Sequence, residues 1–222
     1  MLLLFSKDTS GKMTKNKEIK KLDTTTEEKI KAAARAVFHK KGYAATRTRD
    51  IAKEADINLA LLNYYFRSKE KLFELIMFET LLGFMQHMST VLNNEKTTLE
   101  QKVELIASSY IDLLIKDPNV PIFMLSEIRN NAEGLLEKLP IRQLIINSAF
   151  FRQHQKAVVN GRITEPNPLH FFMNLLGLVV FPFIGKPLLQ GIGGLSEAQF
   201  DKLMQERKKG IPVWIKAMMK AK

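Results

Sequence analysis

The chain has 222 residues and a formal net charge of +11, and 45% of its residues are hydrophobic. That apolar fraction is ordinary for a globular protein and lies above the range of disordered chains. Cysteine is absent, which excludes disulfides, thiolate metal sites and cysteine nucleophiles.

The amino-terminal third is strongly basic. Residues 1–71 contain 17 Lys and Arg against 9 Asp and Glu, whereas the rest of the chain contains 17 against 14. Such a charge distribution attracts polyanions such as DNA, RNA or an acidic membrane surface, although a solvated lysine-rich face is the simpler alternative. Residues 1–23 have no helical period, so we predict a flexible basic arm, with Met1 or Met13 as the start. The opening MLLLF is too short for the apolar core of a signal peptide, which favours a cytoplasmic protein.

Residues 24–68 are predicted to form a domain of three helices. The first helix is expected over residues 26–41 and stops at Gly42. Two short helices over residues 46–55 and 58–66 follow, with a polar break of about three residues between them. This is the spacing of a helix-turn-helix, whose second helix enters the major groove of DNA.

The apolar residues of these three helices divide into a core and an outward face. Leu62 and Phe66 are four residues apart and therefore share one face of the third helix. Leu59 and Asn63 then point outward. The core is predicted to consist of Val37, Phe38, Ile51, Ala55, Ile57, Leu62 and Phe66.

The stretch GYAATRTRDIAKEADINLALLNYYFRSKEKLF resembles the amino-terminal DNA-binding domain of the TetR family of bacterial transcriptional regulators. The resemblance is close over residues 26–73, and the remainder resembles the family only in kind. Two positions depart from the family pattern: Asp56 replaces the usual Gly, and Asn63 replaces the usual Tyr near the DNA backbone. The matching features are Gly42, Tyr43, Thr46, Ile51, Ala52, Ala55, Ile57, Leu62, Phe66, Ser68, Lys69, Glu70 and Leu72.

The resemblance implies a DNA-contacting surface on the second and third helices. Arg49 is our candidate for bidentate guanine recognition, with an ordinary solvated arginine as the alternative. Tyr64 and Lys69 would contact the DNA backbone. The residues predicted to contact DNA are Arg47, Thr48, Arg49, Asn58, Leu59, Ala60, Asn63, Tyr64 and Lys69.

Residues 69–222 are predicted to form a helical domain that binds an effector and dimerises, as the family implies. No stretch alternates convincingly between apolar and polar residues, so the fold class is predicted to be all-α. The expected helices of this domain cover residues 68–92, 98–116, 120–131, 135–160, 168–182 and 196–220.

The last two of these helices are the predicted homodimer interface. Residues 169–185 are apolar almost all round but too short, and interrupted by Pro182, to be a membrane span. A helix that is apolar on every side is buried on every side, here by its own subunit and by a second copy. We therefore expect a homodimer formed through helices near 168–182 and 196–220, no membrane partner, and a roughly palindromic double-stranded DNA operator.

The body of this domain is rich in Phe and Met, which either fill a core or line an adaptable apolar pocket. The family favours a pocket for a small apolar or amphipathic effector. That ligand would change the spacing of the two DNA-binding heads through the long helix that starts at Ser68. The residues predicted to line the pocket are Met88, Tyr110, Phe123, Met124, Phe150, Phe151, His154, Phe171 and Asn174.

Together these features predict a sequence-specific DNA-binding transcriptional regulator, a ligand-responsive repressor that acts as a homodimer. Repression is only the default of the family. The four His residues show no metal-binding spacing, and no nucleophile-elbow or phosphate-loop motif occurs, so neither an enzyme nor a metal or cofactor is expected. The alternatives are a nonspecific binder of nucleic acid or membrane surfaces that uses the basic amino-terminal region, or an enzyme that binds small molecules.

Overall fold

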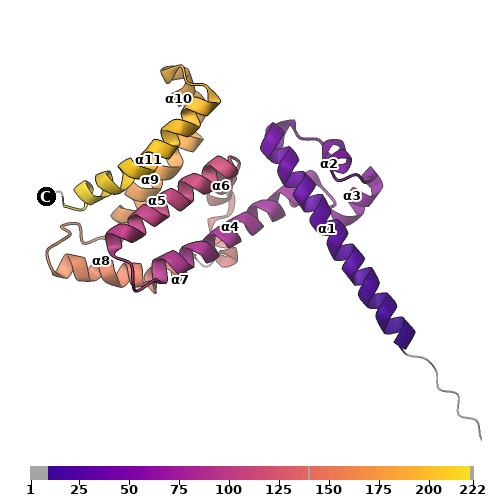
Figure 1. The fold of residues 1–222 in the computed structure, drawn as a ribbon, viewed down its shortest axis with the longest axis horizontal. Coiled ribbons are helices and arrows are strands. Elements are labelled where there is room, and N and C mark those ends of the chain that lie inside the picture. The colour runs from indigo at the N-terminus through magenta and orange to yellow at the C-terminus, as the bar shows by residue number, and fades with distance from the viewer. Residues whose placement is uncertain (1–9, 140, 221–222) are drawn as a thin grey trace, which may run out of the picture. The chain divides into compact units, whose positions relative to one another are not determined.

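The computed structural model describes residues 10–139 and 141–220, and every helix or strand assigned within these ranges is an α-helix (Figure 1). The predicted all-α fold class is confirmed. The chain divides into two compact units between Ile76 and Met77. We call them the head, up to Ile76, and the body, from Met77 onward.

The head is built on a helix-turn-helix. It consists of α1 (Ser10–Ala45), α2 (Thr48–Glu54), α3 (Leu59–Tyr65) and the beginning of α4 (Lys69–Asn93). α2 packs against both α1 and α3. The buried core contains Ile30, Ala33, Ala34, Val37, Phe38, Ile51, Ala52, Ala55, Leu62, Phe66, Leu72 and Ile76.

The head extends further along the chain than the boundary at residue 68 predicted from the sequence. Leu72 and Ile76 of α4 are fully buried. Phe73 lies between two aromatic rings of α1, with its ring centroid 5.0 Å from that of Phe38 and 4.6 Å from that of Tyr43. The first two turns of α4 therefore complete the core of the head.

α1 also begins earlier than expected. It starts at Ser10, so residues 10–23, predicted as part of a flexible arm, are helical, while residues 1–9 lie outside the described residues. No Gly or Pro occurs between residues 12 and 41, and the segment is rich in Lys and Glu, which favour helix. Gly42 has a φ of 73° and interrupts the helix where the sequence predicted its end.

The turn between α2 and α3 depends on Asp56. Its φ of 50° is in the left-handed region, where an L-residue other than Asn or Asp is strained. Asn58 then caps α3, because its Oδ1 accepts a hydrogen bond of 2.8 Å from the backbone N–H of Leu61. The short polar break between the two helices thus has a defined geometry.

In the body, α5 is the central helix. It packs against α8, α9 and α11, and α6 and α10 pack against α9. After α4, the body helices are α5 (Leu99–Lys116), α6 (Val120–Lys138), α7 (Ile141–Ile146), α8 (Ala149–Val159), α9 (Pro168–Ile184), α10 (Lys186–Gly193) and α11 (Glu197–Met218).

The prediction of a single helix over residues 135–160 is wrong. α6 continues to Lys138, and Leu139 then has the extended backbone that a following proline favours. Ser148 starts α8 as its cap, because its hydroxyl accepts a hydrogen bond from the backbone N–H of Phe151. These local interactions divide the segment into the end of α6, α7 and α8.

α9 continues through Pro182 to Ile184, although the sequence analysis expected Pro182 to interrupt it. Proline has no N–H group, so the carbonyl of Leu178, four residues earlier, has no helical donor. The guanidinium of Arg207 on α11 donates to this carbonyl at 2.7 Å. Arg207 also lies over the ring of Trp214, 5.0 Å from its centroid. α11 therefore replaces the hydrogen bond that the proline removes.

Candidate nucleic-acid interface

α3 presents one face to the core of the head and the other to solvent. Leu62 is completely buried and Phe66 nearly so, which matches the apolar face predicted from the sequence. On the outward side, Ala60, Leu61, Asn63 and Tyr64 are exposed, while Leu59 is half-buried. The exposed face of α3 is therefore a mixed surface of methyl groups, one amide and one phenol.

The start of α2 is fixed by Asp50. One carboxylate oxygen accepts a hydrogen bond of 3.0 Å from the backbone N–H of Arg47, and the other lies 3.1 Å from the ammonium of Lys41. The hydrogen bond from Arg47 and the bond to Lys41 hold the pKa of Asp50 below its usual value. This carboxylate is therefore bonded at its own helix terminus.

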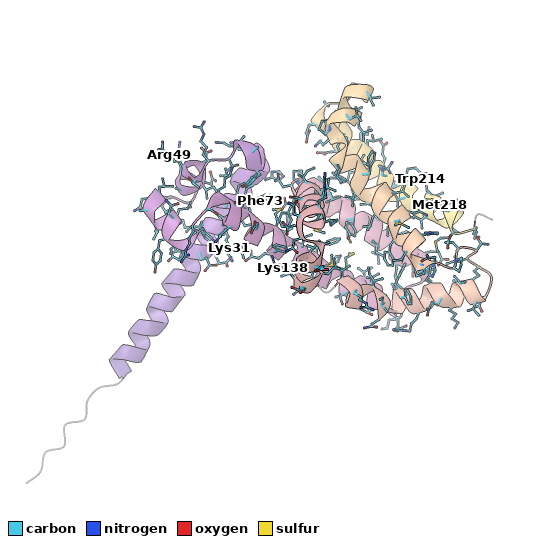
Figure 2. All side chains as sticks on the ribbon, turned by 180° about the vertical axis from the view of Figure 1, so that it is seen from behind. Lys31, Arg49, Phe73, Lys138, Trp214 and Met218 are labelled. Carbon is cyan, nitrogen blue, oxygen red and sulfur yellow. The ribbon has the colours of Figure 1, made fainter. Side chains whose placement is uncertain are left out.

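The cations next to these helices differ in what they bind. Arg49 on α2 and Arg67 after α3 are exposed, and neither side chain makes a hydrogen bond or ion pair with the described residues. Figure 2 shows Arg49 on the outer surface of the head. Thr48, at the first position of α2, is half-buried. Arg49 and Arg67 thus have free donors for an external anion.

Lys69 is engaged inside the head. Its ammonium donates hydrogen bonds of 2.9 Å to the carbonyls of Tyr43 and Thr46. It also lies 4.1 Å from the centroid of the Tyr43 ring, a cation–π geometry. The sequence analysis expected Lys69 to contact a phosphate; that contact stays a prediction, and the interactions present here fix the turn between α1 and α2.

The residues predicted to line an effector pocket mostly pack as core of the body. Asn174 is exposed, and aromatic contacts within the body include that of Phe150 with Phe171, whose ring centroids are 5.1 Å apart. Met88, Phe123, Phe150, His154 and Phe171 are buried, whereas Tyr110, Met124 and Phe151 are half-buried. Of the nine, His154, Phe171 and Asn174 line a small cavity of about 20 Å³.

A larger groove of about 690 Å³ lies elsewhere in the body, between the start of α5, the segment after α8 and the end of α11. Its apolar wall includes Leu99, Val103, Ile163, Ile215 and Met219. Its charged residues are Glu100, Glu104, Arg162, Lys216 and Lys220. Sequence reasoning missed this groove, because charged residues near helix ends look like an ordinary solvated surface.

His154 lines the small cavity, which lies next to this groove. It is 1% exposed, and neither ring nitrogen has a hydrogen-bond partner among the described residues. The small cavity that it lines shares Ile163, Ile215 and Met219 with the groove. Burial lowers the pKa of His154 and thus favours the neutral imidazole, which offers one donor and one acceptor.

The surface of the body also includes an apolar strip on α9. Leu169, Met173 and Phe181 are each about 60% exposed, while Phe171, Leu175 and Val179 of the same helix are buried. Apolar side chains of α11, among them Trp214 and Met218 (Figure 2), are exposed as well.

Within the described ranges, no group of three or more His, Asp and Glu side chains could hold a metal ion.

Comparison with known proteins finds similarity to regulators. Residues 30–76 match the family model of bacterial regulatory proteins of the tetR family. A Bacillus subtilis (strain 168) protein, "Probable HTH-type transcriptional regulator YttP", is 27% identical over 212 residues, which cover 90% of this chain and 96% of that protein. "Fatty acid metabolism regulator protein" from the same organism is 29% identical over 107 residues, 48% of this chain and 55% of that protein.

Among solved structures, the transcriptional regulator FadR from Bacillus subtilis in complex with stearoyl-CoA has a similar fold. The TM-score is 0.55 at 20% sequence identity, and the alignment covers 86% of this chain and 98% of that chain.

We predict that Lys69→Met destabilises the head. The substitution keeps most of the unbranched apolar stem of the side chain but removes two charge-assisted hydrogen bonds, each of which contributes about 1–3 kcal/mol. Circular dichroism should therefore show an earlier loss of helix in urea. The fluorescence of Trp214, which lies in the body, serves as an internal control. An unchanged unfolding curve by circular dichroism would contradict a structural role for Lys69.

Proposed function

Because this chain is a DNA-binding transcriptional regulator of the TetR family, we propose that α2 and α3 recognise a specific operator and that the body dimerises and binds an amphipathic effector. The observation that carries the DNA-binding part is the exposed face of α3, held by a buried core on one side and flanked by free arginines. A protein acting on bacterial chromosomal DNA works in the cytoplasm, where we place it. Effector binding would release the operator, so the protein would act as a repressor.

The proposed DNA contacts follow from what each side chain can offer. α3 lies in the major groove, Arg49 at the start of α2 reads a guanine through both of its acceptors, and Arg67 and Tyr64 bind phosphates. The phosphate contacts supply affinity for any sequence, whereas Arg49 supplies preference for one. Arg47 and Thr48 are placed at the start of α2 for further contacts to the DNA backbone.

We predict that Arg49→Ala weakens binding to the operator by roughly 10- to 100-fold more than binding to a scrambled duplex, since a bidentate contact discriminates by about 1–3 kcal/mol. The matched control is Arg49→Lys, which keeps the charge but loses the bidentate geometry, and should retain the affinity for scrambled DNA. Fluorescence anisotropy with labelled duplexes at fixed salt measures both. Equal losses on the two duplexes would exclude base reading by Arg49.

The proposed dimer forms through the exposed apolar strips of α9 and α11. Large apolar residues exposed along one helix face favour an interface with another protein surface. Leu169, Met173 and Phe181 recur at the spacing of one helix face. A second copy is the occupant that the family suggests, and a two-fold dimer matches a palindromic operator.

Phe181→Glu should shift the protein toward monomer, because it places a charge in the proposed interface while its position in the single chain is 61% exposed. The matched control is Val159→Glu on α8, where the side chain is 85% exposed and outside the proposed interface. Sedimentation velocity at micromolar concentration measures the oligomeric state. A wild-type protein that is already monomeric, or a Phe181→Glu protein that remains fully dimeric, would contradict the proposed interface.

The proposed effector site is the groove of the body together with the small cavity that His154 lines. Its volume of about 690 Å³ is in the usual range of ligand sites. The apolar wall suits a hydrocarbon chain, and Arg162, Lys216 and Lys220 suit an anionic group. The similar FadR structure contains stearoyl-CoA, which makes long-chain acyl compounds the first class to test.

We predict that stearoyl-CoA lowers operator affinity by roughly 5- to 150-fold, the usual range of coupling between effector and DNA sites. The double substitution Lys216→Ala and Lys220→Ala should raise the stearoyl-CoA concentration needed for this release. Lys202→Ala, an exposed lysine of α11 outside the groove, is the control. Operator affinity that does not respond to stearoyl-CoA would exclude this effector class, and a full response in the double variant would exclude this groove.

A further inference from the structure

We infer that α3 selects A·T base pairs, with the side chains of Ala60 and Leu61 contacting thymine methyl groups and the amide of Asn63 pairing with adenine. The inference deepens the proposed function and rests on it, because it specifies the DNA that the exposed face of α3 recognises. It concerns the composition of the half-site rather than the existence of DNA binding.

The composition of α3 limits what it can read. Its seven residues, LALLNYY, contain no Lys, Arg, Gln, Asp, Glu, His, Ser or Thr. Guanine presents two acceptors in the major groove and is usually read by Arg or Lys, whereas the amino group of cytosine requires an acceptor such as Asp or Glu. α3 has neither kind of charged side chain, so a G·C pair facing it could bond only to the amide of Asn63 or to a tyrosine hydroxyl, and it would lack the bidentate partner that guanine finds in arginine.

The amide of Asn63 is free for base recognition, whereas the amide of Asn58 also caps α3. The Oδ1 of Asn58 already accepts the capping hydrogen bond from Leu61, which uses one of its two lone pairs and holds the side chain at the start of α3. Asn63 is exposed, and its side chain makes no hydrogen bond with the described residues. Its donor and acceptor together match the amino group and N7 of adenine.

The remaining exposed groups of α3 near its amino-terminal end are methyl groups. Ala60 is exposed and the side chain of Leu61 is 36% exposed, although both are apolar. In the major groove, the base-pair group that such side chains recognise is the C5-methyl of thymine. Burial of a methyl group against them removes apolar surface from water on both sides.

Arg49 belongs to α2, so the guanine proposed for it lies outside the base pairs that face α3. The half-site expected from the head is therefore a short A·T segment next to a G·C pair. An A·T preference can also arise from the shape and flexibility of the DNA, without any contact to the methyl group. The test must separate these two sources.

The first experiment selects bound sequences from random duplex DNA with the full-length protein and then replaces single thymines of the selected half-site by uracil. Uracil keeps the base pair but lacks the methyl group, so each contacted thymine should cost about fourfold in affinity. Equal binding of every uracil-substituted duplex would overturn methyl recognition. Selection of G·C pairs at the positions that Asn63→Ala affects would overturn the A·T inference altogether.

The second experiment is a double-mutant cycle that combines a substitution in the protein with a uracil substitution in the DNA. In Leu61→Ala, the loss caused by uracil should shrink at the thymine that Leu61 contacts and remain at the others. Asn63→Ala should reduce the preference for adenine at one position by roughly tenfold. Unchanged affinity for scrambled DNA shows that both variants are folded; if either is not, the uracil series on the wild-type protein decides alone. A complete lack of sequence preference in the selection would instead contradict the proposed function.

Discussion

The head depends on the burial of two side chains of a helix that is too short to be stable alone. α3 has seven residues, and isolated helices of this length do not persist in water. Leu62 and Phe66 are buried in the core of the head, where α3 packs against α2, and Asn58 satisfies a backbone donor at the start of α3. Because this packing sets the orientation of the helix, it also decides which side chains face outward.

The chemistry of the interface follows from that constraint. Leu62 and Phe66, which are four residues apart, are buried in the core. The exposed residues of α3 carry apolar groups, one amide and one phenol. Charged groups lie on neighbouring segments, at Arg49 and Arg67. The two free arginines thus lie outside α3, on segments next to it, and Lys69, which the sequence alone assigned to a phosphate contact, bonds to the turn between α1 and α2.

Features determined by local interactions could be predicted from the sequence. The apolar period of α3, the break at Gly42 and the polar turn around Asp56 all depend on residues within a few positions of one another, and the helix-turn-helix was found correctly. The predicted helix over 135–160 failed because the extended backbone of Leu139 ends α6 and the hydroxyl of Ser148 starts α8, and these local effects outweigh the apolar period. The groove could not be predicted from the sequence, because its walls come from α5, α11 and the segment after α8, which only the tertiary fold brings together.

The bond between Arg207 and the carbonyl of Leu178 makes the roles of two distant positions of the chain, Pro182 and Arg207, depend on each other. Any residue other than proline at position 182 would supply the missing N–H and compete with the guanidinium for the same oxygen. Arg207 would then keep a half-buried positive charge with fewer acceptors, while loss of Arg207 alone would leave the carbonyl unpaired. In descendants of this sequence, exchanges at the two positions should therefore appear together more often than singly.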